Sequence, residues 1–102
     1  KNLGIPQKNA PSLDNPGYSE TDVTRLSYYA MLLGRAAGCG FIIERQAGKV
    51  GGWVDKTFSS DKDYYLTTLV SGMELNATAQ INGTSPDSCS SIKSQLNKTS
   101  WP

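Results

Sequence analysis

Apolar side chains recur every three to four residues through most of this chain, which is the pattern of amphipathic helices. The first such stretch begins near Ser19, where Ser19-Glu20-Thr21-Asp22 offers N-cap hydroxyls and early acidic groups, and it ends at the glycines that flank Cys39. Its apolar positions form a broad band: Val23, Leu26, Tyr29, Ala30, Met31, Leu32, Leu33 and Ala37. We therefore predict a substantially buried first helix. Within it, small residues at 30, 34 and 38 are four apart and predict a groove that another backbone can approach closely.

The second stretch is weakened by three glycines, at positions 48, 51 and 52, each of which costs a helix about 1 kcal/mol relative to alanine. It still has a helical face, with Lys49 and Asp55 on the opposite side. The residues of that face are Gln46, Val50, Trp53, Val54 and Phe58. We predict a helix over Glu44–Thr57, with Trp53 as its anchor in the core.

The third stretch has the strongest helical pattern. Ser59, Ser60 and Asp61 provide a start signal, and Asn82-Gly83 provides a stop. Between them the apolar positions keep a 3.6-residue rhythm: Tyr65, Leu66, Leu69, Val70, Met73, Ala77 and Ile81. A fourth, short helix is predicted from Ser85-Pro86-Asp87, because a hydroxyl cap, a proline and an early acid suit a helix start, and it should run to about Lys98.

Residues 1–18 differ from the rest of the chain. Prolines at 6, 11 and 16 disfavour helix, and few side chains there are suited to burial. We predict an extended or flexible arm over 1–18 and a single helical domain over 19–102. The expected fold class is all-α, a small bundle of about four helices.

Cys39 and Cys89 are the only cysteines among 102 residues, and we predict that they form a disulfide. One ends the first predicted helix and the other falls in the first turn of the last, so the bond should tie both helices to one end of the bundle. A loop of this size stabilises the fold by about 4 kcal/mol through the entropy of the unfolded chain. Such a bond indicates an oxidising compartment, and hence a periplasmic or secreted protein.

Charge and hydropathy exclude several function classes. Ten Lys and Arg balance nine Asp and Glu, for a formal charge of +1, and neither sign forms a long run. Nucleic-acid binding is therefore not expected, because it normally needs a basic footprint. No segment approaches the roughly 18 apolar residues of a membrane span.

Catalysis, metals and cofactors are not expected either. The chain has no histidine, which removes the commonest general base and the commonest metal ligand. A pair of carboxylates remains the one catalytic alternative. Its candidates are Glu44, Asp55, Asp61, Asp63 and Glu74, which we interpret instead as helix caps and solvated faces, with Glu74 of interest only if buried.

The tyrosine doublets 28–29 and 64–65 indicate a contact surface. Neighbouring residues on a helix point about 100° apart, so one tyrosine of each pair should face outward, and exposed tyrosines favour protein interfaces. Tyr28, Tyr64 and Trp101 are the predicted partner-binding residues. The alternatives are that the tyrosines only rim the core and that Trp101 docks back on the bundle.

Three Asn-X-Thr triplets, at Asn76, Asn82 and Asn97, are potential glycosylation sites, which we interpret as chance matches and hence favour a bacterial periplasmic setting. The arrangement of one cysteine ending an early helix and one opening a late helix resembles small periplasmic two-cysteine proteins. Two such groups are the acid-stress chaperones of the HdeA type and the immunity proteins of type VI secretion amidase effectors. The segment 34–40, Gly-Arg-Ala-Ala-Gly-Cys-Gly, carries no signature of either group, so no functional residue is transferred.

Both groups act by binding other proteins, and the resemblance implies the same for this chain. We therefore expect a non-catalytic exported protein that binds another protein, as an inhibitor, immunity protein or adaptor, with a homodimer as an open alternative. An acid-stress chaperone is the second hypothesis, since protonation of nine carboxylates would move the formal charge from +1 to +10. A carrier of a small apolar ligand is the third.

Overall fold

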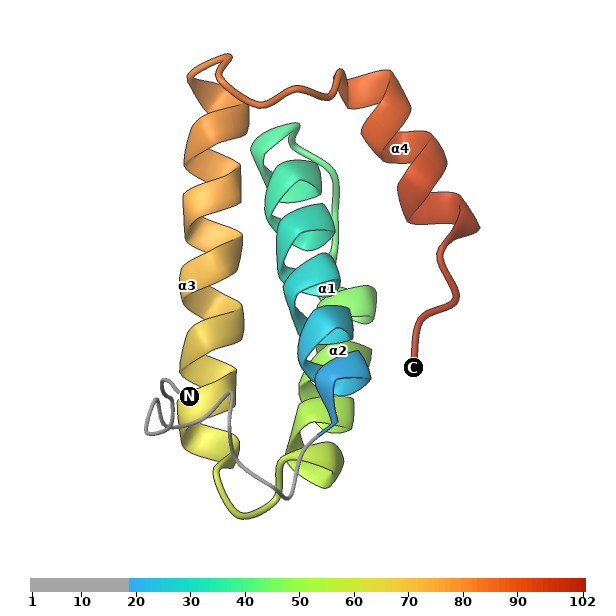
Figure 1. The fold of residues 1–102 in the computed structure, drawn as a ribbon. Helices are drawn as coiled ribbons and strands as arrows, with labels where there is room; N and C mark the ends of the chain where they lie inside the picture. Colours follow the sequence, from blue (N-terminus) through green and yellow to red (C-terminus); the bar gives the residue numbers. More distant parts are fainter. Residues whose placement is uncertain (1–18) are drawn as a thin grey trace.

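The computed structural model describes residues 19–102, which form four helices: α1 (Glu20–Gly38), α2 (Glu44–Thr57), α3 (Lys62–Ile81) and α4 (Cys89–Lys98) (Figure 1). No strand is present in this part of the chain, so the all-α class is confirmed. The arm predicted for residues 1–18 lies outside the described residues.

Helix α1 is the centre of the fold, because it contacts each of the other three helices. In Figure 1 it runs between α3 on one side and α4 on the other. The core follows from this placement. Side chains of all four helices form one buried cluster, in which the fully enclosed residues are Leu32, Leu33, Ala36, Val50, Val54, Phe58 and Ile92.

The small-residue groove predicted on α1 is occupied by the backbone of α3. A Cβ atom added at Gly34 would come within 2.8 Å of the Cα of Met73 and of the Cβ of Asn76. A Cβ added at Gly38 would meet the carbonyl oxygen of Ala77 at the same distance. Real Cβ atoms do not approach other atoms this closely, so α1 and α3 can lie at their observed spacing only because both positions are glycine.

The ends of α1 follow the sequence signals. The Ser19 hydroxyl accepts a hydrogen bond from the Asp22 N–H, which confirms the predicted N-cap. At the other end Gly40 has a positive φ of 86°. The N–H groups of Gly40 and Phe41 donate to the carbonyls of Ala37 and Ala36, which is a Schellman motif.

The start of α4 differs from the prediction. Ser88, not Ser85, is the N-cap, with its hydroxyl accepting from the Ser91 N–H, and the helix begins at Cys89. The reason lies in the tertiary contacts of Asp87. The Asp87 carboxylate pairs with Arg35 at 2.7 Å and the Asp87 carbonyl accepts from Gln80 Nε2, so this segment is held against α1 and α3 before the helix begins.

Three residues assigned to buried helix faces are exposed: Ala37, Val70 and Ile81. Val70 and Ile81 are exposed because the apolar band of α3 is wider than the side of the helix that the rest of the bundle covers. The helix contacts α1 and α2 along one side only, with Tyr65 and Leu69 buried, and leaves its other side in solvent. In the part of the chain that is described, no helix is long and apolar enough to cross a membrane.

Cys39 and Cys89 are bonded, with their Cα atoms 5.7 Å apart. Cys39 is the C-cap of α1 and Cys89 is the first residue of α4, so the disulfide joins these helices at one end of the bundle, as predicted.

Candidate functional site

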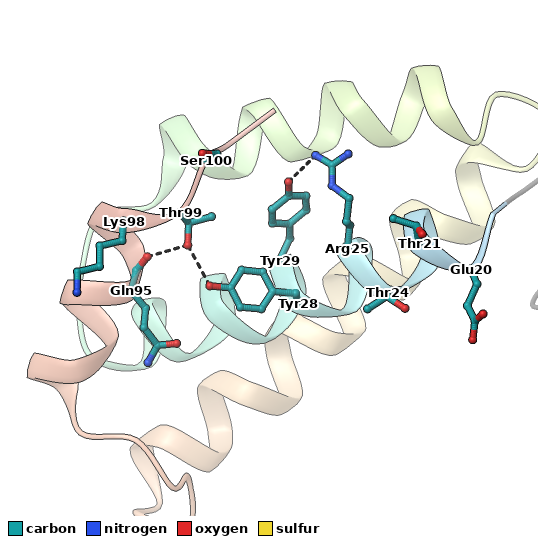
Figure 2. A pocket seen from close by; sticks show the side chains of 10 residues that line it. All are labelled: Glu20, Thr21, Thr24, Arg25, Tyr28, Tyr29, Gln95, Lys98, Thr99 and Ser100. Atoms are coloured by element: carbon teal, nitrogen blue, oxygen red, sulfur yellow. Dashed lines mark hydrogen bonds between the residues drawn. The ribbon is translucent and has the colours of Figure 1, made fainter.

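A groove of about 880 Å³ lies between the first half of α1 and the C-terminal segment of the chain. We call it the C-terminal groove. Figure 2 shows its side chains, which come from α1, from the end of α4 and from the two residues that follow α4. They are Glu20, Thr21, Thr24, Arg25, Tyr28, Tyr29, Gln95, Lys98, Thr99 and Ser100.

The C-terminal segment forms one wall because it turns back on the bundle after α4. The Thr99 hydroxyl donates to the Gln95 carbonyl at 2.7 Å, and Tyr28 Oη lies 3.0 Å from Thr99 Oγ1, which joins the wall to α1. Trp101 Nε1 donates to the Leu96 carbonyl at 3.1 Å. These bonds hold both sides of the groove in fixed positions.

Aromatic rings support the groove from the core. Tyr29 is only 4% exposed, and its ring lies 5.4 Å from the rings of both Trp53 and Trp101. Trp53 continues the contact to Phe58, whose ring stacks on Tyr65 at 4.2 Å. Packed aromatic pairs of this kind stabilise by about 0.5–1.5 kcal/mol beyond the area they bury. The floor of the groove is therefore part of the hydrophobic core.

Arg25 is held at the groove by a hydrogen bond and by aromatic contacts. Its Nη2 donates to Tyr29 Oη at 2.7 Å, and its guanidinium carbon lies 4.8 Å from the centre of the Trp53 ring. A guanidinium over an aromatic face is attracted by the ring quadrupole. Within residues 19–102, no carboxylate lies within ion-pair distance of Arg25.

The groove is suited to binding. Its charged groups are Arg25, Lys98 and Glu20, so cations exceed carboxylates by one, and hydroxyls and an amide supply both donors and acceptors. Exposed and buried aromatic surface lies beside these polar groups. Pockets that take ligands combine these two kinds of surface.

The predicted partner-binding residues lie in different places. Tyr28 is 38% exposed and lines the C-terminal groove, while Tyr29 is buried beside it. Tyr64 is 54% exposed at the start of α3 and does not line the groove, while its neighbour Tyr65 is buried. One tyrosine of each doublet thus faces outward, as predicted. Their role in binding a partner stays a prediction.

Trp101 docks back on the bundle, and its role in binding a partner stays a prediction. Its ring packs on Tyr29 and it is half-buried. Its other side borders a small hollow with Arg45, Gln46 and Lys49. It supports the wall of the groove and is still accessible for a contact.

The candidate carboxylates show no sign of a catalytic pair among the described residues. Glu74 is exposed on α3, and Asp55 pairs with Lys62 at 3.4 Å on the surface. Over the described residues, no cluster of three or more acidic or cysteine side chains could hold a metal ion. Asp87, interpreted as an acid at a helix start, is instead the partner of Arg35.

Sequence reasoning missed Arg25, Gln95 and Thr99. One local signal was present, because Arg25 and Tyr29 are four residues apart and therefore neighbours on one helix face. The contacts of Arg25 with Trp53 and of Thr99 with Tyr28 join segments far apart in the sequence, and no local pattern predicts them.

Comparison with family models, with curated proteins and with solved structures finds no match for this chain.

Proposed function

We propose that this chain is an exported, non-catalytic protein that binds another protein through the C-terminal groove. The observation that carries the proposal is the groove itself, which has fixed walls, an exposed tyrosine and a guanidinium in one place. Tyrosine and arginine are enriched among the residues that contribute most to protein interfaces. Fixed walls favour affinity, because little side-chain order is lost on binding.

We favour a segment of another protein over a small apolar ligand as the occupant of this groove. The groove is open along one side and ringed by hydroxyls, an amide and charged groups, whereas sites for apolar ligands enclose most of the ligand surface. A peptide brings backbone donors and acceptors that can pair with such a rim.

The disulfide supports export, because such bonds persist in oxidising compartments. The bond is compatible with a periplasmic or a secreted protein, and the periplasm is our proposal.

Affinity capture tests the proposal. The disulfide-bonded protein is immobilised and exposed to the exported protein fraction of its source organism. We expect one stoichiometric partner. A Thr24→Trp variant, which fills the groove from an exposed position on α1, should lose that partner.

The matched control is Thr67→Trp, which places the same side chain at an exposed position on α3, outside the groove. Equal capture by both variants would show that the partner binds elsewhere, and the groove proposal would then be wrong. No capture by the wild-type protein would contradict the binding function itself.

A further inference from the structure

We infer that the C-terminal groove recognises an acidic segment of the partner, with an Asp or Glu carboxylate bound to the guanidinium of Arg25 beside the hydroxyl of Tyr29. This inference rests on the proposed function and names the chemistry of the partner. It is carried by the state of the Arg25 side chain, which is held by Tyr29 and Trp53 and has no anionic partner among residues 19–102.

The guanidinium has five N–H donors. Within residues 19–102 the guanidinium forms one hydrogen bond, from Nη2 to Tyr29 Oη. It also packs over the rings of Tyr29 and Trp53. Arg25 lines the groove, and its remaining donors have no hydrogen-bond partner among the described residues. A planar guanidinium with adjacent free donors matches a carboxylate, which can accept two parallel hydrogen bonds.

Tyr29 adds a second donor at the same point. Its oxygen accepts from Arg25, so its own O–H hydrogen is free to donate, and no acceptor for it lies among the described residues. The Tyr29 side chain is 4% exposed, so bulk water has little access to it. A ligand acceptor that binds this hydroxyl would therefore satisfy a largely buried donor. An acceptor placed beside Arg25 could take a hydrogen bond from each residue.

Arg35 on the same helix provides the comparison. It is paired with Asp87 at 2.7 Å, as expected for a half-buried arginine. Arg25 is half-buried as well, but rings and a hydroxyl take the place of the carboxylate. No carboxylate of residues 19–102 pairs with Arg25 as Asp87 does with Arg35, so the carboxylate of a ligand could do so.

The other charged groups of the groove favour an extended acidic segment. Lys98 lies on the opposite wall from Arg25 and offers a second cationic contact. Glu20 is the one carboxylate of the lining and comes from the first residue of α1. Between the cations, the Tyr28 ring and the threonine hydroxyls are suited to the backbone and apolar parts of a peptide.

Selection from a displayed library of random 12-residue peptides, against the disulfide-bonded protein, tests the inference. We expect the enriched peptides to share an Asp or Glu at a fixed position. Tryptophan fluorescence, to which both Trp53 beneath Arg25 and Trp101 beside Tyr29 contribute, then reports binding of a synthetic peptide. Replacing the shared acid by its amide should weaken binding by about 10- to 100-fold, the loss expected for one charged hydrogen-bonded contact.

Protein variants give the reciprocal measurement. Arg25→Gln should weaken binding of the acidic peptide to the same extent, and Arg25→Lys should weaken it less. The matched control, Lys93→Gln, removes one positive charge from an exposed position outside the groove and should change the affinity by less than about twofold. Because Arg25 contacts the core, circular dichroism must show that each variant is folded. The comparison of acid and amide peptides needs no variant.

The inference is wrong if no peptide is enriched, if the enriched peptides share no acid, or if the amide peptide binds as tightly as the acid. In the last two cases a loss of binding in Thr24→Trp would still uphold the groove as the binding site. The proposed function fails separately, when the captured partner is insensitive to Thr24→Trp.

Discussion

Two arginines on α1 illustrate how individual side chains acquire different roles in this protein. Arg35 Nη1 pairs with Asp87, and this contact fixes the segment that leads into α4. Arg25 is held by Tyr29 and Trp53 at the groove, and its other N–H groups have no hydrogen-bond partner among residues 19–102. Sequence alone does not distinguish the two, because Asp87 and Trp53 are distant in the chain from the arginines that they contact.

Removing the partner of Arg35 should destabilise the protein. In Asp87→Ala the guanidinium, whose Nε already has no partner among the described residues, would be left without its ion pair at 15% exposure. We expect a loss of about 2–4 kcal/mol in the free energy of unfolding, the range for a buried charge left alone and reduced here for partial exposure. Urea denaturation of the disulfide-bonded protein measures it.

The matched control is Asp55→Ala. Asp55 pairs with Lys62 at 3.4 Å, and more than half of each side chain is exposed. Solvent screening makes such a pair worth little, so the change should stay within about 0.5 kcal/mol. Equal effects of the two substitutions would show that the Arg35 contact is not a structural one.

At the scale of elements, the helix boundaries were largely predictable because their signals are local. The hydroxyl of Ser19 and the glycines at 40 and 83 act through neighbouring backbone groups, and the structure has caps at these places. The start of α4 was not predictable in this way. Ser85, Pro86 and Asp87 carry the pattern of a helix start, yet the contacts of Asp87 with α1 and α3 delay the helix to Cys89.

The contact between α1 and α3 gives a prediction about glycine. In Gly34→Ala the new methyl group would collide with the Met73 carbonyl and the Asn76 side chain. The gain in helix propensity is about 1 kcal/mol, whereas overpacking costs about 1–3 kcal/mol and here involves a backbone that cannot move alone. We expect a net loss of stability, measured as a lower urea midpoint.

Gly48→Ala on α2 is the opposite case. A methyl group there meets no atom within 4 Å, so only helix propensity changes, and the protein should gain up to about 1 kcal/mol. If both alanine variants stabilised the protein, the close approach of α3 to Gly34 would be contradicted.

At the scale of the whole molecule, the disulfide and the C-terminal segment decide the shape. The bond ties α4 to the C-terminal end of α1, and Trp101 and Thr99 tie the end of the chain to the middle of α1. The groove exists only because the segment after α4 turns back. The four-helix class was predictable from periodicity, but the groove was not, since it depends on how separate elements meet.

Loss of the disulfide should be a large effect. The Cys39→Ser, Cys89→Ser double variant frees a loop of 50 residues in the unfolded state, and we expect a loss of about 4 kcal/mol in the free energy of unfolding. Urea denaturation of the variant beside the oxidised protein measures the difference. A loss below about 1 kcal/mol would show that helix packing alone holds α4 in place.

The most direct test of the central claim is NMR mapping of the bound surface. Backbone amide shifts of the isotope-labelled, disulfide-bonded protein are recorded as the captured partner is added. Our account predicts that the largest changes fall on Thr21, Thr24, Tyr28, Gln95 and Thr99, the two walls of the groove. Changes confined instead to the exposed side of α3, around Leu75 and Ile81, would contradict it and move the binding surface to that helix.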